Sequence, residues 1–217
     1  MIAPAKFVGR SVPRLEDRPL LTGQGRFAAD ISFPGQWCMR VVRSPVAHGK
    51  IVSIDAAAAL KVPGVHAVWT AADVAHIPPI PFRLTGLKTL EPYRQSVLAK
   101  YLVRYVGEPV VLVFAENQYT AEDAAELVEI NILPLRATLV STEGPGLFAD
   151  KLTTEPGVVR KGYGDVDATF RNAHAIVSLE LSVGRHSGVP MECRGAIAHY
   201  DETRDILEMH GAAKVPH

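Results

Sequence analysis

The sequence predicts an α+β protein, in which a mixed domain of strands and helices precedes the start of a second unit. Three observations support this prediction. Short runs rich in β-branched residues alternate with Ala-rich runs of helical spacing between residues 37 and 139. A stretch rich in Gly, Pro and Thr then interrupts the periodicity at 141–164. Beyond it, one short helical run precedes three strand-like runs, so both parts mix the two kinds of element.

The chain opens with an arm. Residues 1–30 are rich in Arg, Pro and Gly, and their weak periodicity predicts an extended segment with turns rather than a helix. The next predicted elements are strands at 37–43 and 51–54 and a helix at 56–61. Asp55 is the predicted N-cap of that helix, because its carboxylate can accept from the free amides of the first turn. The pair Pro63-Gly64 ends it.

A second strand-rich stretch completes the first domain. Its predicted elements are a strand at 65–70, a surface excursion at 71–94, strands at 97–106 and 109–115, a helix opened by Thr120, and a strand at 130–133. Thr120 and Asp123 have the spacing of a capping box. The helix has one apolar face, which comprises Ala121, Ala124, Ala125 and Val128. Small residues on that face favour close packing on a sheet.

The second unit contains fewer elements. Asp165 can cap a short helix that runs to Asn172, and strands are predicted at 175–183, 195–200 and 206–210, the last two forming a hairpin. One helix and three strands cannot bury enough apolar surface to form a stable domain by themselves. We therefore expect the rest of this domain to lie outside this sequence. The predicted divisions are an N-terminal arm (1–20), a mixed domain (21–140), a linker (141–164) and an incomplete second domain (165–217).

Composition excludes several functional classes. The 217 residues include 23 Lys plus Arg and 23 Asp plus Glu, and a net charge of zero argues against a nucleic-acid-binding protein. No run approaches the roughly 20 apolar residues that span a bilayer. The first ten residues lack the pattern of a signal peptide, so the expected location is the cytoplasm.

The sequence also lacks the motifs by which a chain binds a metal or a nucleotide, or catalyses a reaction, by itself. The eight histidines form no HExxH or other metal-binding spacing. Cys38 and Cys193 predict two buried or partly buried thiols, and two cysteines cannot hold an iron–sulfur cluster. The glycine pairs at 23–25 and 162–164 lack the context of a nucleotide-binding loop. No GxSxG elbow is present, so we expect no catalytic residue and no metal ligand on this chain.

Several stretches, read together and in order, resemble a known family. They are 9–17 (GRSVPRLED), 20–27 (LLTGQGRF), 42–51 (VRSPVAHGKI), 62–65 (VPGV), 105–110 (YVGEPV), 121–128 (AEDAAELV), 185–192 (RHSGVPME) and 213–217 (AKVPH). The series is similar to the front of molybdenum hydroxylase large subunits, the family of xanthine dehydrogenase, aldehyde oxidase and carbon monoxide dehydrogenase. The resemblance implies a "hammerhead" α/β domain followed by the start of a molybdopterin-binding domain.

The family resemblance implies cofactors and partners as well. Its members oxidise aldehydes, N-heteroaromatics or similar small molecules at a molybdenum–molybdopterin cofactor and pass electrons to two [2Fe–2S] clusters and usually FAD. We therefore expect the cofactor to be shared with a C-terminal large-subunit chain, with an iron–sulfur subunit and an FAD subunit as further partners. The family's glycine-rich cofactor loop and its late catalytic glutamate are absent from this sequence.

Lys214 is the candidate cofactor neighbour. Many relatives carry, at its position, a glutamine that approaches the oxo group of the metal, whereas a lysine would place a charge there. The alternative reading is a lysine at a surface or hairpin end. For the whole chain, the first hypothesis is one part of a split, multi-subunit molybdenum hydroxylase, inactive when isolated. The alternatives are a truncated, non-catalytic interaction or assembly module and a longer protein of which this is a piece.

Overall fold

The computed structural model describes residues 7–82, 86–140, 142–184, 186–190 and 192–211. The chain divides into two compact units, one over residues 37–178 and one that combines the residues before 37 with those after 178. Helices and strands are mixed in both, as predicted. Within the described ranges no helix is long and apolar enough to cross a membrane.

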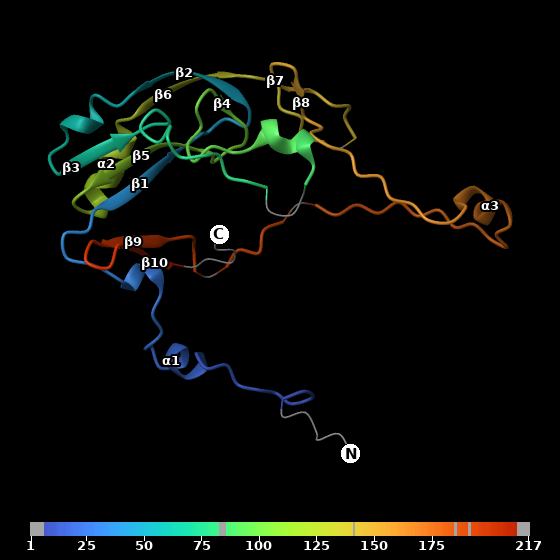
Figure 1. Cartoon of the computed structure of the whole chain (residues 1–217), viewed down its shortest axis with the longest axis horizontal. Coiled ribbons are helices and arrows are strands. Elements are labelled where there is room, and N and C mark those ends of the chain that lie inside the picture. Colours follow the sequence, from blue (N-terminus) through green and yellow to red (C-terminus); the bar gives the residue numbers. More distant parts are fainter. Residues whose placement is uncertain (1–6, 83–85, 141, 185, 191, 212–217) are drawn as a thin grey trace. The chain divides into compact units, whose positions relative to one another are not determined.

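One antiparallel sheet of the larger unit has the strand order β1-β5-β3 (Figure 1). Its strands are β1 (Cys38–Arg43), β5 (Pro109–Ala115) and β3 (Val65–Trp69), all within or close to predicted strands. The central strand, β5, is the most buried, since Val110, Val111 and Val113 are fully enclosed. Such a continuous apolar run is typical of a strand that is covered on both faces.

The second sheet of this unit has the order β4-β2-β6, again antiparallel. It contains β4 (Leu102–Val103), β2 (Gly49–Asp55) and β6 (Glu129–Pro134). The predicted strand 97–106 is therefore reduced to two residues. The ladder ends there because Arg104 and Glu108 close the following segment into a turn, with Gly107 at a φ of +91°.

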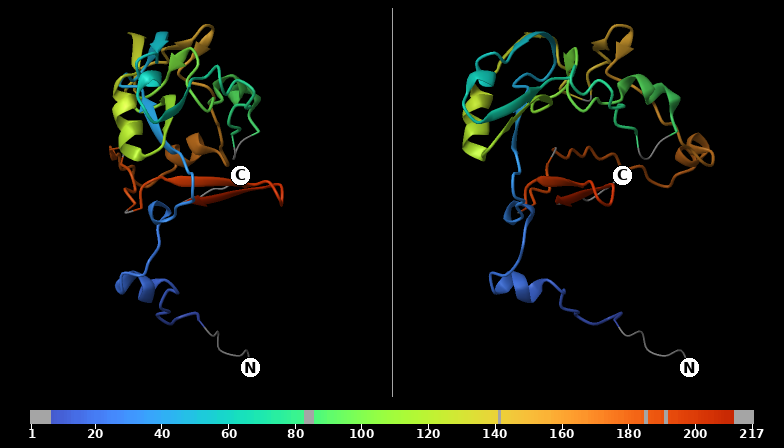
Figure 2. Two further views of the ribbon diagram at one scale, coloured as in Figure 1. Left: turned by 90° about the vertical axis from the view of Figure 1, so that its left-hand side faces the viewer. Right: turned by 60° about the vertical axis from the view of Figure 1, so that its left-hand side comes forward.

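Helix α2 (Gln118–Glu126) covers the β1-β5-β3 sheet (Figures 1 and 2). Ala121 and Ala124 are buried beneath it, as the sequence predicts. The predicted capping box at Thr120 and Asp123 is wrong. Asn117 is the N-cap, and its side-chain oxygen accepts from the amides of Tyr119 and Thr120 at 3.0 and 2.9 Å, because the helix begins one position after it.

The core lies between the two sheets, α2 and a short 3-10 turn, η2 (Ala59–Lys61). Its buried members are Ala59, Ala99, Val103, Val110, Val111, Val113, Ala124 and Val128. Each fully buried valine contributes about 1.5–3 kcal/mol relative to exposure. The predicted helix 56–61 is only this one turn, although Asp55 does accept from the amide of Ala57 at 2.8 Å.

The segments predicted as excursion and linker contain small elements. A 3-10 helix, η3 (Lys88–Tyr93), lies in the excursion. The strands β7 (Leu147–Ala149) and β8 (Leu152–Thr153) pair antiparallel inside the predicted linker. The Tyr93 hydroxyl donates to the carbonyl of Thr153 at 2.8 Å and thereby ties the two segments together. Further on, Asp165 caps α3 (Val166–Arg171) by accepting from the amide of Ala168, as predicted.

The second unit is built on a hairpin. Strands β9 (Ala196–Asp201) and β10 (Ile206–Gly211) pair antiparallel, as predicted. The arm contains a short helix, α1 (Asp17–Leu21), and a 3-10 turn, η1 (Ala28–Asp30), where the sequence predicts no helix. The predicted strand at 175–183 is wrong, since no described strand pairs with it.

Candidate functional site

The predicted cofactor neighbour, Lys214, lies outside the described residues. Strand β10 ends at Gly211, and this hairpin is therefore the described structure nearest to it in sequence. Among described residues no group of three or more His, Cys, Asp or Glu side chains could hold a metal ion. The candidate sites in the described part of the chain are the side chains around the hairpin and the pockets of the larger unit.

One face of the hairpin holds an aromatic cluster. The ring of Phe33 stacks on His199, with centroids 4.9 Å apart and planes 9° from parallel, and lies 5.7 Å from His210. The two histidines are not directly opposite, because His199 pairs with Glu208 and His210 with Ile197. Nε2 of His210 is buried without a hydrogen-bond partner among described atoms. The two imidazoles thus pack around one phenyl ring and do not form a ligand pair.

The segment before β9 is tied to the arm. The Glu192 carboxylate accepts a hydrogen bond from the amide of Ala28 at 3.1 Å, although the two residues are 164 positions apart. At the same open end of the hairpin, a Cβ on Gly211 would clash with the carbonyl oxygen of Gly195. Only glycine permits this close approach of the strands. Cys193, next to Glu192, is exposed rather than buried, whereas Cys38 is partly buried as predicted.

An ionic network closes the tip of the hairpin. Nε of Arg204 contacts the Asp201 carboxylate at 2.6 Å, and its Nη2 reaches Glu208. Asp201 also accepts from the amides of Thr203 and Arg204, at 2.9 and 3.1 Å. The hydrogen bonds from Arg204 hold the pKa of Asp201 below its ordinary value of 3.8. These groups are on the surface, and their arrangement orders a turn rather than performing chemistry.

A pocket of about 430 Å³ surrounds His48 in the larger unit. Its lining is mainly apolar and includes Leu102, Leu135 and Phe148. His48 is 8% exposed, and its two ring nitrogens lie 2.8 Å from the carbonyl oxygen of Arg136 and 2.9 Å from that of Phe148. Since carbonyls only accept, both hydrogen bonds form together only when both nitrogens carry hydrogen. The imidazole therefore connects the start of β2 to Arg136, which follows β6, and to Phe148, which lies in the segment that the sequence predicts as a linker.

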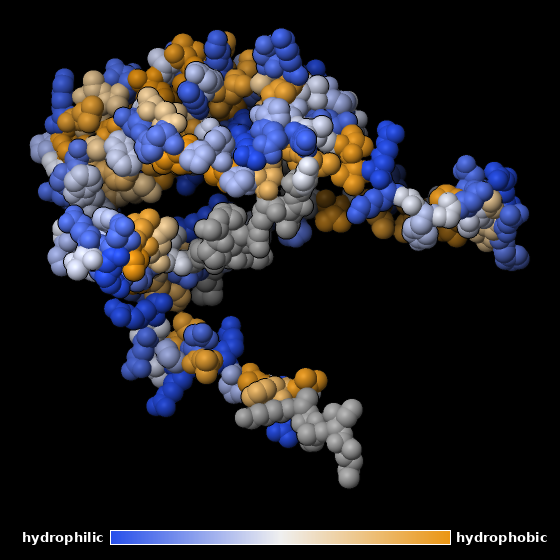
Figure 3. Space-filling view, viewed as in Figure 1, coloured by the Kyte–Doolittle hydropathy of each residue, from blue (hydrophilic) through white to orange (hydrophobic). Residues whose placement is uncertain are grey.

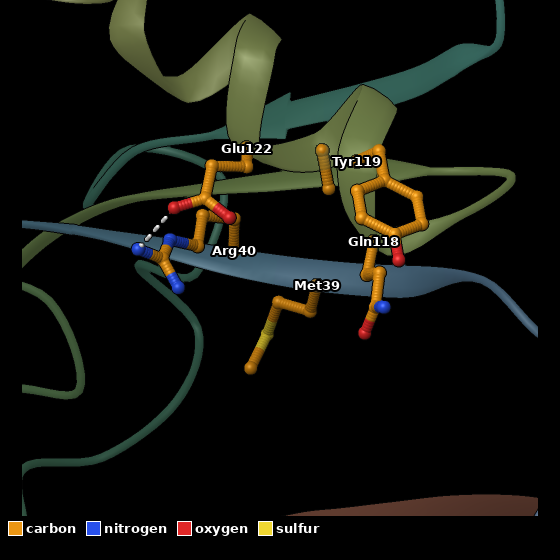
Figure 4. A pocket seen from close by; sticks show the side chains of 6 residues that line it. Met39, Arg40, Gln118, Tyr119 and Glu122 are labelled. Carbon is orange, nitrogen blue, oxygen red and sulfur yellow. Dashed lines mark hydrogen bonds and ion pairs between the residues drawn. The ribbon is translucent and has the colours of Figure 1, made fainter.

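A second pocket, of about 350 Å³, lies between β1 and α2 (Figure 4). Arg40 and Glu122 form an ion pair of 2.9 Å across it, and Met39, Gln118 and Tyr119 complete its rim. The side chains of Arg40 and Glu122 are 54% and 53% exposed. The pair is therefore screened by water, and the rim holds no nucleophile beside a base.

Glu108 is the only charged side chain among the described residues that are almost fully buried. Arg104 contacts it three times: from its amide at 2.5 Å, from Nε at 2.9 Å and from Nη2 at 2.5 Å. A carboxylate enclosed by one guanidinium and one amide has no open position for a substrate. Glu108 therefore has a structural role in the turn after β4.

Comparison with known protein families identifies two domains that the side chains described above do not reveal. The family model "Aldehyde oxidase and xanthine dehydrogenase, a/b hammerhead domain" matches residues 22–135. The model "Molybdopterin cofactor-binding domain" matches residues 151–217. Two models thus match in succession and together account for most of the chain.

Similar proteins are much longer than this chain. The nicotine 6-hydroxylase large subunit of Paenarthrobacter nicotinovorans is 41% identical over 97% of this chain, which spans 26% of that protein. The carbon monoxide dehydrogenase large chain of Hydrogenophaga pseudoflava is 32% identical, with 93% of this chain and 27% of its own length covered. The chain therefore spans about a quarter of these relatives.

Solved structures also match most of this chain and only about a quarter of their own length. Quinoline 2-oxidoreductase from Pseudomonas putida 86 gives a TM-score of 0.77 at 37% identity and covers 93% of this chain and 26% of its own. Aldehyde oxidoreductase from Desulfovibrio gigas gives 0.77 at 25% identity, with 91% and 23% covered. The similarity extends over both units of the chain and not over one domain alone.

Proposed function

This chain belongs to the aldehyde oxidase and xanthine dehydrogenase family of molybdenum hydroxylases, as the N-terminal portion of a large subunit, and from this premise we propose that it functions as one part of a multi-subunit oxidoreductase. The proposal rests on one observation above all. A hammerhead model and a molybdopterin-binding model match in succession over residues 22–135 and 151–217. A chance match would not reproduce both domains in the same order.

The proposed role is to position and enclose the cofactor and not to carry out catalysis alone. Support for this role comes from the match of residues 151–217 to the molybdopterin cofactor-binding domain, and Lys214, the proposed cofactor neighbour, lies within that range. We propose that the remaining walls of the site come from sequence that corresponds to the other three quarters of the relatives. In such an enzyme the cofactor supplies the redox chemistry, and the protein supplies orientation and electrostatics.

The proposed substrate is a small molecule, either an aldehyde or an N-heteroaromatic. Relatives with 37–41% identity are a nicotine hydroxylase large subunit and a quinoline oxidoreductase, which favours the N-heteroaromatic class over carbon monoxide. We further propose that electrons pass to [2Fe–2S] clusters and FAD on partner subunits. Two free cysteines on this chain are consistent with clusters held elsewhere.

Metal analysis of the native complex tests this function. The chain would be tagged in its source cells and purified gently, and molybdenum, iron and flavin would be measured beside the mass of every co-purifying polypeptide. We expect about one molybdenum and four iron atoms per copy of the chain, two irons for each of two clusters. Purification of the chain without metal or partner would contradict the proposal and favour a non-catalytic module. A tagged polypeptide of the relatives' full length would identify the sequence as a piece of one large subunit.

A further inference from the structure

One histidine side chain contacts both ends of the segment that joins the two matched domains. The hammerhead model ends at residue 135 and the molybdopterin-binding model begins at residue 151, so residues 136–150 form the connector between them. Nδ1 of His48 lies 2.8 Å from the carbonyl oxygen of Arg136, and Nε2 lies 2.9 Å from that of Phe148. A single imidazole thus bridges the first residue of the connector and a residue close to its end.

The strand that carries Phe148 is short and superficial. Strand β7 has three residues and, among the described residues, pairs only with β8. None of residues 142–153 is buried, and the hairpin lies at the surface of the larger unit, where Figure 3 shows hydrophobic and hydrophilic residues side by side. An isolated two-stranded hairpin is at best marginally stable in water. Its attachment to the larger unit therefore depends on individual side chains, which are His48 and, through the hydroxyl that bonds to Thr153, Tyr93.

The contacts of His48 depend on its protonation state. A carbonyl oxygen only accepts hydrogen bonds, and a neutral imidazole carries hydrogen on one nitrogen alone. The neutral ring can therefore donate to Arg136 or to Phe148 but not to both, and its second nitrogen then places a lone pair against a carbonyl oxygen. The imidazolium donates to both carbonyls at once. Because His48 is only 8% exposed, water has little access to replace a lost bond.

The charged groups around the imidazole belong to types that titrate in other pH ranges. Among the described residues that line the pocket beside His48, Arg136 and Asp150 are the charged ones, and the lining side chains of β4 and β7 are apolar. The guanidinium of Arg136 is 88% exposed and pairs with Glu143 at 3.7 Å. From η3 the facing titratable group is Tyr93, whose ring centroid lies 5.2 Å from that of Phe148. Imidazole is the only one of these group types that ordinarily changes charge between about pH 5 and 8.

The two ends of the connector are not held equally well. At the first end, the amide of Leu135 donates to the carbonyl of His48 at 2.8 Å and continues the ladder between β2 and β6. Arg136 is therefore kept beside the imidazole by the backbone, whatever the state of the ring. No such ladder joins β7 to β2 among the described residues. Loss of one hydrogen from the ring is thus expected to release Phe148 and not Arg136.

We propose that His48 is a proton-dependent bridge between the two ends of the connector. With hydrogen on both nitrogens it holds Arg136 and Phe148 together, and with hydrogen on one nitrogen it lets β7 loosen. The second hydrogen bond exists only in the protonated form, so its contribution is present at lower pH and is lost as the pH rises through the titration of the imidazole. The connector next to the molybdopterin-binding region thereby becomes more mobile on the alkaline side.

Hydrogen exchange at several pH values tests the bridge in the full chain. Exchange of the amides of residues 147–149, corrected for the intrinsic effect of pH on exchange, would be followed from about pH 5 to 8, where imidazole ordinarily titrates. We expect protection in the unaltered chain to fall about fivefold over this range, the loss of one ordinary hydrogen bond. In His48→Gln, whose amide does not titrate, protection should change less than about twofold.

His66→Gln is the matched control, because the exposed His66 stacks on Trp37 and lies outside the connector. This variant should keep the fivefold fall. An equal fall in His48→Gln, or no fall in the unaltered chain, would overturn the bridge.

The ring hydrogens supply a measurement that needs no variant. In NMR spectra of the full chain at about pH 5, His48 should show two ring N–H signals that exchange slowly with water, and at about pH 8 it should show one. A single protected ring N–H at the lower pH would overturn the proposal, because one of the two carbonyls would then lack a donor. Two protected signals at the lower pH, lost together with the protection of β7, would support it.

Discussion

Arg104 encloses the carboxylate of Glu108, a side chain that is only 1% exposed, with Nε 2.9 Å from Oε1 and the Arg104 amide 2.5 Å from Oε2. The two residues are four positions apart, and Gly107 between them turns the backbone at a φ of +91°. A buried charge is tolerated only when it is paired and hydrogen-bonded. The pair therefore fixes the turn that joins the two sheets of the larger unit.

The first prediction is that Glu108→Gln destabilises the chain by about 3 kcal/mol, because it leaves the guanidinium without its counter-charge in a buried site. Urea unfolding of the full chain measures this loss. The matched control is Glu122→Gln, which removes the 2.9 Å pair with Arg40, where both side chains are about half exposed. The control should cost less than about 1 kcal/mol. Equal losses in the two variants would refute a structural role for the buried pair.

The second prediction concerns the start of α2. Asn117→Ala should lower the free energy of unfolding by about 1 kcal/mol, because the amides of Tyr119 and Thr120 lose their acceptor. Asn117→Asp keeps an acceptor at the positive end of the helix and should cost little. Thermal unfolding of both variants measures the difference. If the aspartate variant were as unstable as the alanine variant, the cap would not depend on the accepting oxygen.

The cap of α2 illustrates what sequence patterns can and cannot settle. The helix and its buried face were predictable, since Ala121 and Ala124 follow the helical repeat and need no distant residue. The cap was misplaced because Asn117 and Thr120 are both good N-cap residues three positions apart, and packing against β1 and β5 decides between them. Strand β4 is short for a similar reason, since the Arg104–Glu108 turn competes with the ladder.

The segment 175–183 shows a different limit. Its apolar alternation predicts a strand, and this prediction is wrong for the described residues, because a strand needs a neighbour and none of them provides one. The alternation of apolar residues shows that a segment can form a half-buried strand, but it does not show whether a neighbouring strand is present to pair with it.

Candidate site residues were harder to predict than the fold. Lys214 was identified only through family resemblance. His48 gave no signal as a structural link, because its two acceptors are 88 and 100 positions away in sequence. The contact of Phe33 with His199 likewise joins distant segments, so only the folded backbone brings these rings together.

The third prediction tests the link made by His48. His48→Phe keeps a ring beside Phe148, whose ring centroid is 6.1 Å away, and removes both hydrogen bonds. We expect a loss of about 1 kcal/mol for each hydrogen bond that the ring donates, one from a ring with hydrogen on a single nitrogen and two when both nitrogens carry it, and faster hydrogen exchange in β7. His66→Phe is the control, since the exposed His66 only stacks on Trp37, with ring centroids 4.5 Å apart. If β7 exchanged at the same rate in both variants, His48 would not hold it.

The fourth prediction is a pH titration of Asp201. Its pKa lies below the ordinary 3.8, first because the side chain of Arg204 hydrogen-bonds to its charged form and next because the amide of Arg204 does. For a carboxyl with a lowered pKa, the contribution to folding is present above the unfolded value and is lost as the pH falls through the folded value. The hairpin tip should therefore be fully ordered at neutral pH and loosen only below about pH 3.8.

Substitution of the partner tests the cause of that shift. Arg204→Gln should raise the pKa of Asp201 toward 3.8, because it removes the 2.6 Å contact while the amide of residue 204 remains. The carboxyl carbon signal of Asp201 in NMR spectra follows the titration directly. Arg171→Gln, in α3, changes net charge equally without touching the hairpin and should leave the midpoint in place. A midpoint that moved equally in both variants would assign the shift to overall charge, whereas movement in the Arg204 variant alone assigns it to the hydrogen bond that closes the turn.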